Sequence, residues 1–557
     1  MPEWEYWYTF EDDKEVQPFT HVSELSIKNC PKLLKMLPSD LLCLNNLDIT
    51  GCPQFLVEVS SLVLPSLTSL TMNDVPLTSL QAVLEMRSMI NDEVISANAK
   101  SKHLSSITSL SIGMIEELEF LPKWVTHGLM ELEALKITRC EELKTLWRNE
   151  VRVQHSLPGF RHLLIRGCPR LVSLFEEDED EEKEGQHQQQ QQHEGLPCIV
   201  RLEHLRIDNC EKLEKLPRLL HTFTFLRELY VVKCPSLGSF PETGFPCTLK
   251  RLEIRDCEAL QSLFRWITQI NDNNLEVLGV LDCPSLTCLI SSRGGGLPPT
   301  LKELQIYRCK KLEALLVEEG MEINCPFLEF VWIRACDRLK YLPGALPNNN
   351  NNLRNLSQLF LNGCENLEYI LEGWFHSAIN LTQLDITGCK KLKALPGLPH
   401  VLQAINYLTS LEYLGMNISD WNNHFKKIGL HSFLSLTTLR IEGPISVHLS
   451  DVAGSSFPID GMLLPTSLIS LSIVNFRNLE KLSSKLFQYL ASLEHLHIRG
   501  CPSLKSLPVQ RLPPSLMELS INGSRKITER CEKGKGKYWS HLAHIPRVHV
   551  VDDDDDE

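Results

Sequence analysis

The chain has 557 residues, of which 43% are hydrophobic, and this proportion excludes a chain that is disordered throughout. Its formal net charge of -14 is mostly local, because residues 176–184 and 552–557 have net charges of -7 and -6, respectively. The rest of the chain is close to neutral, which excludes a basic field that would attract nucleic acid over the whole surface.

The first residues and the length of the apolar runs indicate the cellular compartment. The sequence begins MPEWEYWYTF, without the basic and apolar regions of a secretory leader. No run of about 18 apolar residues occurs, so we expect no membrane span. We therefore expect a cytoplasmic or nuclear protein, whose 19 cysteines stay reduced.

One phrase, L-x-x-L-x-I-x-x-C, recurs along the chain and is often followed by P-x-L-x-x-L-P. It reads VSELSIKNCPKLLKMLP from Val22, LEHLRIDNCEKLEKLP from Leu202 and LEHLHIRGCPSLKSLP from Leu493. We count about 19 copies, a periodicity typical of repeat architectures. The second leucine-type positions of the copies are Leu25, Leu47, Leu70, Leu110, Leu135, Leu163, Leu205, Leu229, Leu252, Leu278, Leu304, Val331, Leu359, Leu384, Leu414, Leu439, Leu471, Leu496 and Leu519.

Each copy predicts a short strand, because L-x-I alternates apolar and outward residues with period two. Strands joined by return segments of this length form a parallel sheet. The returns contain Leu-Pro and Pro-Pro pairs, which favour irregular, 3₁₀ or short helical segments. The sequence thus predicts an α/β solenoid, a leucine-rich-repeat horseshoe with a parallel β-sheet on the concave face, convex returns and about 19 repeats.

Thirteen cysteines occupy the same slot, directly after the predicted strand. A metal site or disulfides are one reading of this pattern, but the chain has no C-x-x-C pair and successive slots are a whole repeat apart. We favour the interpretation that these cysteines are small buried side chains that contact backbone polar groups at the turn. They are Cys30, Cys52, Cys140, Cys168, Cys210, Cys234, Cys257, Cys283, Cys309, Cys336, Cys364, Cys389 and Cys501.

Six segments follow one another along the chain. We predict a lead-in over 1–21, repeats over 22–175, a disordered acidic and glutamine-rich insertion over 176–195, repeats over 196–524, a C-terminal cap over 525–551 and an acidic tail over 552–557. Within the first repeat block, the spacing from Leu77 to Ile90 predicts a helix on the convex side. His187 and His193 in the insertion could bind a metal weakly, but a solvated polar tract is the better interpretation.

The repeat phrase resembles the leucine-rich-repeat region of plant intracellular immune receptors, the class with a coiled coil and a nucleotide-binding module. MPEWEYW at Met1 is similar to a phrase within that region. The ending ERCEKGKGKYWSHLAHIPRVHV resembles the family's close in Arg530, Cys531, Gly534, Gly536, Trp539, His544, Ile545 and Pro546. The resemblance implies recognition of a pathogen effector or a guarded host protein, and regulation of a nucleotide-binding switch.

The sequence departs from that family in one respect. It contains no G-x-x-x-x-G-K-[ST] loop, and GKGKYWS at Gly534 has the wrong spacing, so nucleotide binding is not carried over and we expect no cofactor.

Sequons at Asn355, Asn380, Asn417 and Asn522 are chance matches in a cytosolic chain. The histidines are scattered and no Ser/His/Asp or Cys/His set has a local signature, so we expect no enzyme activity and no metal site.

One surface patch stands out in three successive repeats. Tyr307, Arg308, Phe330, Trp332, Arg334 and Phe360 are predicted on or beside the concave face. Aromatic side chains flanked by arginine are typical of protein interfaces. The alternative is that these large side chains only stack along the sheet and shield one another.

The sequence therefore predicts a protein-recognition module in plant defence. Its expected partners are a pathogen effector or host protein, and a nucleotide-binding module supplied in trans, with no nucleic acid. A substrate-recognition adaptor of a ubiquitin ligase is an alternative, but residues 1–21 are too short for the helical segment it needs. A receptor fragment without function is the other alternative.

Overall fold

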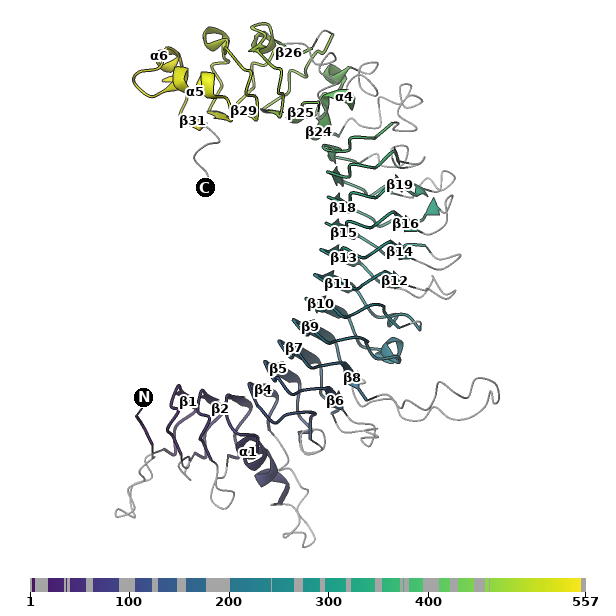
Figure 1. Cartoon of the computed structure of the whole chain (residues 1–557), viewed down its shortest axis with the longest axis vertical. Helices are drawn as coiled ribbons and strands as arrows, with labels where there is room; N and C mark the ends of the chain where they lie inside the picture. Colours follow the sequence, from purple (N-terminus) through teal and green to yellow (C-terminus); the bar gives the residue numbers. More distant parts are fainter. Residues whose placement is uncertain are drawn as a thin grey trace. The chain divides into compact units, whose positions relative to one another are not determined.

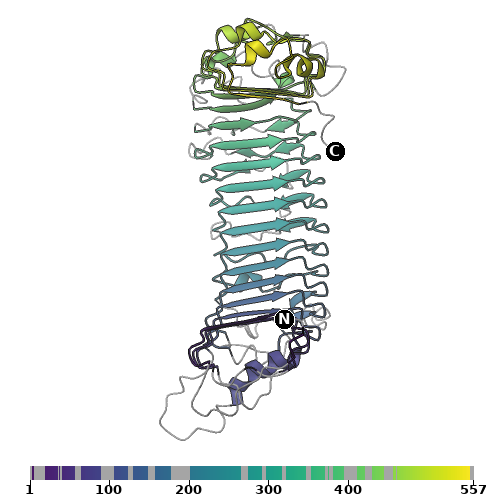
Figure 2. The same ribbon diagram turned by 90° about the vertical axis from the view of Figure 1, so that its left-hand side faces the viewer.

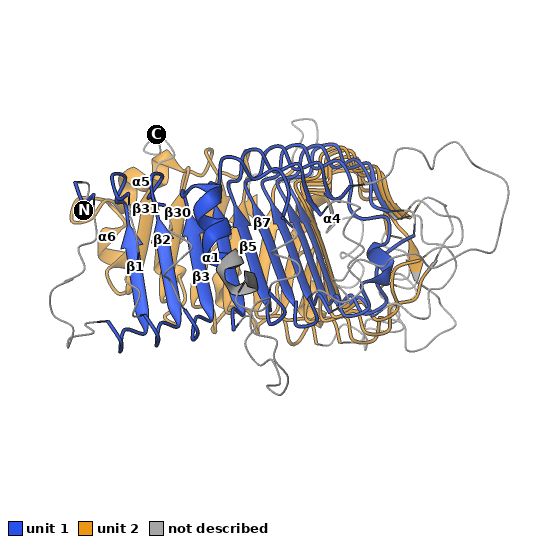
Figure 3. Ribbon diagram, turned by 90° about the horizontal axis from the view of Figure 1, so that it is seen from below, with its two compact units in different colours: residues 1–275 blue, residues 276–557 orange. Residues whose placement is uncertain are grey.

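The structure is a computed structural model. It describes residues 3–5, 19–34, 37, 41–56, 64–89, 106–122, 129–147, 157–176, 201–241, 243–264, 274–290, 296–316, 322–345, 353–370, 374, 380–393, 410–420, 429–444, 456–459 and 461–551. The chain divides into two compact units, Met1–Leu275 and Glu276–Glu557 (Figure 3). Most of the predicted lead-in, nearly all of the predicted insertion with its two histidines, and the acidic tail lie outside the described residues.

Unit 1 contains a parallel sheet of five-residue strands in which each strand pairs with the next (Figure 1). Its strands are β1 (Glu24–Lys28), β2 (Asn46–Thr50), β3 (Ser69–Asn73), β4 (Ser109–Gly113), β5 (Ala134–Thr138), β7 (His162–Arg166), β9 (His204–Asp208), β10 (Glu228–Val232) and β11 (Arg251–Arg255).

Unit 2 repeats the same arrangement, and Figure 2 shows the strands lying one above another. Its strands are β13 (Val277–Leu281), β15 (Glu303–Tyr307), β18 (Phe330–Arg334), β21 (Gln358–Asn362), β23 (Gln383–Asp385), β24 (Tyr413–Asn417), β25 (Thr438–Glu442), β27 (Ser470–Val474), β29 (His495–Arg499), β30 (Glu518–Asn522) and β31 (Arg547–Val551).

The apolar side chains of neighbouring strands lie in register. In unit 1, Leu70 is the partner of Leu47 on one side and of Leu110 on the other. In unit 2, Leu304 has the same relation to Leu278 and Val331. All six side chains are buried. Every predicted leucine-type position lies in one of these strands, so the predicted parallel solenoid is confirmed.

The returns are more regular than the sequence indicated. Short 3₁₀ segments occur as expected, for example η2 (Leu220–Thr222) and η9 (Val509–Arg511). Short parallel ladders also form in the returns, and we did not predict them. They form because the L-x-x-L part of the return repeats the alternation of the main strand over two or three residues. They pair β6 (Thr145–Trp147) with β8 (Ser173–Phe175), β14 (Cys288–Ile290) with β16 (Ala314–Leu316), β17 (Glu322–Ile323) with β20 (Gly344–Ala345), β19 (Tyr341–Leu342) with β22 (Tyr369–Ile370) and β26 (Ser456–Phe457) with β28 (Lys481–Leu482).

The predicted helix is present as α1 (Leu77–Met89). It lies on the side of unit 1 away from strands β2 and β3 (Figure 1). Leu80 and Leu84 on this helix are buried, and the Ser79 hydroxyl donates a hydrogen bond to the Phe55 carbonyl oxygen. The helix therefore replaces an irregular return without interrupting the sheet.

The last residues extend the sheet of unit 2. Helices α5 (Arg525–Cys531) and α6 (Trp539–Leu542) bury Ile527 and Leu542, and the chain then enters β31. Val548 of β31 is the register partner of Leu519 in β30. This segment thus covers the edge of β30, which would otherwise expose unpaired backbone groups.

A residue with left-handed backbone conformation follows most of the main strands, and its N–H group forms a hydrogen bond to the next repeat. The N–H groups of Asp282, Arg308 and Ala335 donate to carbonyl oxygens of the next repeat at 2.7, 2.9 and 2.8 Å. Their φ angles are 55°, 51° and 53°. Gly363 and Gly388 occupy the same place with φ of 66° and 75°. The turn therefore extends the backbone pairing by one residue beyond each strand.

Two of these glycines allow a matched test of the turn. A Cβ on Gly388 would lie 2.8 Å from the Gly363 Cα, whereas a Cβ on Gly363 would lie 3.8 Å from the Ala335 nitrogen. We expect Gly363→Ala to lower the free energy of unfolding by about 1 kcal/mol, the cost of left-handed backbone in alanine. Gly388→Ala adds a backbone clash, for about 2–4 kcal/mol in total. Urea unfolding followed by circular dichroism measures both, and equal losses would contradict this account.

The recurrent cysteines lie in the interior, as predicted. All thirteen are in the thiol form rather than in disulfides, and they are at most 3% exposed. The thiol of Cys30 points to the Lys28 carbonyl oxygen at 3.4 Å, and that of Cys501 to the Arg499 carbonyl oxygen at 3.5 Å. Ser524 fills the same slot after β30 and donates to the Cys501 carbonyl oxygen at 2.9 Å. Where the slot holds cysteine or serine, its side chain therefore contacts a backbone carbonyl oxygen; after β3, β4 and β27 the slot holds the buried apolar residues Val75, Ile115 and Phe476.

Candidate protein-binding surface

The six predicted surface residues lie together on three adjacent strands of unit 2. Trp332 on β18 is the register partner of Phe360 on β21, and Arg334 is the partner of Tyr307 on β15. Phe330 begins β18 on the same face, because side chains alternate along a strand. Arg308 follows β15 directly. We call Tyr307, Arg308, Phe330, Trp332, Arg334 and Phe360 the aromatic patch.

The rings of the aromatic patch contact one another across the strands. Tyr307 and Trp332 stack with centroids 5.7 Å apart and ring planes 12° apart. Phe330 and Phe360 contact at 6.1 Å with tilted planes. The guanidinium groups of Arg308 and Arg334 lie 4.8 and 5.7 Å from the Tyr307 ring centroid, within the range of a cation–π interaction.

Stacking does not remove the aromatic patch from solvent. All four rings are half-buried, whereas Arg308 and Arg334 are exposed. The Arg308 guanidinium is also paired with the Asp282 carboxylate, which holds it beside the patch. The aromatic side chains therefore shield one another in part, as the alternative interpretation proposed. A partly exposed apolar surface with arginine side chains at its border nevertheless remains accessible.

Tyr413 extends the aromatic patch and was missed by the sequence analysis. It begins β24, and its ring lies 6.2 Å from that of Phe360. The missed signal was the column of residues directly before the strand leucine, to which Phe330 and Tyr413 both belong. The return before β24 is long, and its residues 394–409 lie outside the described residues.

A buried polar network supports this end of the aromatic patch. The Tyr413 hydroxyl donates to the Asp385 carboxylate at 3.0 Å, and the Thr387 hydroxyl donates to the same group at 2.7 Å. Asp385 is only 5% exposed. Burial, and next the charge of Asp385, raise the pKa of Tyr413, so its hydroxyl stays protonated and keeps donating this hydrogen bond. The ring of Tyr413 is thereby held in place.

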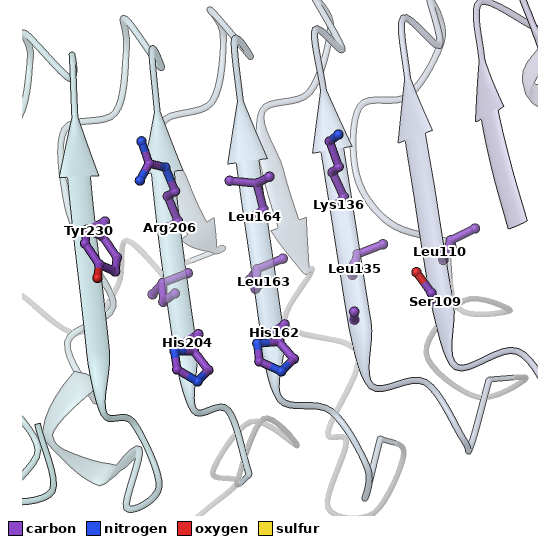
Figure 4. A pocket seen from close by; sticks show the side chains of 12 residues that line it. Ser109, Leu110, Leu135, Lys136, His162, Leu163, Leu164, His204, Arg206 and Tyr230 are labelled. Carbon is purple, nitrogen blue, oxygen red and sulfur yellow. The ribbon is translucent and has the colours of Figure 1, made fainter. Parts of the chain in front are cut away.

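Unit 1 carries a second feature, a hollow of about 310 Å³ on its sheet (Figure 4). Part of its lining comes from the residues between the strand leucine and isoleucine, Lys136, Leu164, Arg206 and Tyr230. The rest comes from four strand leucines and from the residues directly before them, Ser109, Ala134, His162 and His204. The hollow was not predicted.

Two kinds of feature are absent from the described part of the chain. No group of three or more His, Cys, Asp or Glu side chains there is arranged to hold a metal ion. No described helix has the length and apolar character needed to cross a membrane.

Comparison with curated proteins finds plant disease resistance proteins. The chain is 31% identical over 352 residues to one such protein of Arabidopsis thaliana, covering 63% of this chain and 23% of that protein. It is 24% identical over 364 residues to the Arabidopsis disease resistance protein RPP4, covering 62% of this chain and 29% of that protein. The chain thus spans less than a third of the length of these relatives. No protein-family model matches it.

Solved structures similar to the chain contain leucine-rich repeats or a cysteine ladder. A leucine-rich-repeat protein of Leptospira interrogans matches with a TM-score of 0.38 and 14% identity, covering 95% of this chain and 96% of that one. The functional domain of InlJ from Listeria monocytogenes, which includes a cysteine ladder, matches with a TM-score of 0.30 and 13% identity over 64% of this chain and 60% of that one.

Proposed function

Since this chain is a leucine-rich-repeat solenoid similar in sequence to plant disease resistance proteins, we propose that it is a protein-recognition module of plant defence. Its ligand is a pathogen effector or a guarded host protein. In an intact receptor the same repeats regulate a nucleotide-binding switch, which is supplied in trans where the chain lacks it.

The observation that carries this proposal is the aromatic patch. Its rings are held by one another and by the sheet, so a ligand that covers them loses little conformational freedom on the protein side. Fixed, half-buried aromatic side chains with arginine at their border have the composition of interface hot spots. We propose that Trp332 and Phe360 are the anchors, and that Tyr307, Phe330, Arg308 and Arg334 surround them.

The test compares three forms of the chain expressed in plant leaf tissue. They are the wild type, the double variant Trp332→Ala/Phe360→Ala and a control, Tyr489→Ala. Tyr489 is 65% exposed and lies in a return rather than on the sheet, so its loss matches the chemistry without touching the patch. Hot-spot truncations weaken binding by about 30-fold or more. We therefore expect ligands that co-purify with the wild type and the control, but not with the double variant.

A second arm adds a nucleotide-binding module of the same receptor class as a defined probe. Co-purification with the wild-type chain supports the regulatory role in trans, and no association removes that role while leaving recognition intact. Identical protein partners for all three forms would contradict recognition through the aromatic patch.

A further inference from the structure

The hollow of unit 1 begins where a row of stacked rings ends. His204 and His162 lie in register on β9 and β7, with ring centroids 4.7 Å apart and planes 10° apart. The next residue in that row is Ala134 on β5, followed by Ser109 on β4. These small side chains leave a gap beside the His162 ring, as Figure 4 shows.

The gap is suited to a flat apolar group. Neighbouring strands are about 4.8 Å apart, so a ring placed above Ala134 would continue the histidine stack at its existing spacing. Partial burial, and next the neighbouring His204, lower the pKa of His162, so its ring is neutral at physiological pH. A neutral imidazole stacks on an aromatic ring without a charge to desolvate.

The row of residues above the gap is cationic. Lys136 lies two residues after Ala134 on the same face of β5, and it is exposed without an ion pair to any described residue. Arg206 lies on β9 in the same row, with Leu164 between the two (Figure 4), but its guanidinium is already paired with the Asp208 carboxylate at 3.5 Å, so Lys136 is the cation left for a ligand. None of the residues that line the hollow is acidic. A ligand carboxylate is therefore the complementary charge.

We propose that this hollow binds an extended peptide segment of a protein partner, with an aromatic side chain in the Ala134 gap and a carboxylate at Lys136. Ala134 and Lys136 are separated by roughly 6.6 Å along the strand. An extended peptide presents its side chains i and i+2 on one face at the same separation. The recognised motif is thus an aromatic residue and an acidic residue two positions apart. This site is separate from the aromatic patch of unit 2 and does not depend on it.

The experiment uses the full chain and a peptide with both spacings, acetyl-Gly-Glu-Gly-(5-fluoro-Trp)-Gly-Glu-Gly-amide, observed by ¹⁹F NMR. A second peptide has Gln in place of both Glu residues. Ala134→Trp fills the gap, and we expect it to weaken binding by at least about tenfold, because it removes the space for the peptide ring. Ser470→Trp is the matched control, since Ser470 occupies the same row on β27 of unit 2. This control should leave binding unchanged.

Lys136→Gln tests the charge without filling the gap. We expect it to weaken binding of the Glu peptide up to about fivefold, the range of an exposed ion pair, and to leave binding of the Gln peptide unchanged. Three results would each overturn the proposal: no binding of the Glu peptide at about 1 mM, equal binding by the wild type and Ala134→Trp, or an equal effect of Lys136→Gln on both peptides. None of these results bears on the aromatic patch, whose variants lie in the other unit.

Discussion

The free energy of unfolding of this protein will fall steeply as the pH rises above 9. Burial raises the pKa of Cys309 from 9.0 to about 12, and it raises the pKa of Cys234 to about 12 and that of Cys501 to about 11. Thiols of the unfolded chain ionise near 9.0, whereas the buried thiols do not. Each therefore contributes stability that is present below pH 9 and is lost as the pH rises towards the folded-state pKa.

One thiol is worth about 1.4 kcal/mol for each pH unit in this window. At about pH 10.5 we therefore expect Cys309 alone to cost about 2 kcal/mol relative to pH 8. Cys309→Ser should remove that part of the loss, because a serine hydroxyl already fills the same slot at Ser524 and does not ionise. The measurement is urea unfolding of wild type and variant at both pH values.

Cys43→Ser is the control for this measurement, because Cys43 is exposed. It should leave the pH dependence as in the wild type. If Cys309→Ser and the wild type lose the same free energy between the two pH values, the buried slot does not hold its thiol in the neutral form.

Replacement of Trp374 by alanine will destabilise the repeats around it by about 3–5 kcal/mol, the usual cost of deleting a buried tryptophan side chain. Trp374 is 1% exposed and is among the largest fully buried side chains of the described residues. Its ring nitrogen donates a hydrogen bond to the Pro343 carbonyl oxygen at 2.8 Å. This contact joins the return after β18 to that after β21, so its loss acts on the returns of two strands of the aromatic patch.

Solenoid repeats contact mainly their neighbours, so the loss should be local. Hydrogen exchange should show faster exchange in β18 and β21 than in β29, which is several repeats away. Trp374→Phe retains most of the apolar volume but leaves the Pro343 carbonyl oxygen without its donor, and we expect about 1–3 kcal/mol. Phe327→Ala is the control, since Phe327 is 52% exposed. A uniform change in exchange along unit 2 would contradict this local account.

Much of the fold was predictable, because the residue pattern within each repeat is enough to predict its strand and the turn that follows. The L-x-I alternation marks the buried face of each strand, and the recurring cysteine marks the turn that follows it. Leu70, Leu304 and Leu496, which are far apart in the sequence, all lie buried at the same strand position. The short ladders of the returns were not predicted, since two or three alternating residues, as in β19, are too few to distinguish from a loop.

The aromatic patch was predictable for the same reason. Tyr307, Trp332 and Phe360 belong to repeats of similar length, so counting residues from one strand to the next places them side by side. Tyr413 was not found, because the sequence analysis did not follow the residues directly before the strand leucine, the column to which Tyr413 belongs. Its contact with Phe360 and its hydrogen bond to Asp385 became visible only in the structure.

The sequence by itself determined the strand positions, the buried cysteine slot and the residues of the aromatic patch, because each depends on periodicity within and between neighbouring repeats. Only the tertiary structure decided which outward residues form a common surface. The hollow beside His162 exists because an alanine on one strand lies next to a histidine on another, and its shape depends on side-chain packing across strands. Such packing depends on the orientation of each side chain and on the space left between side chains, which a repeat pattern read along the chain does not contain.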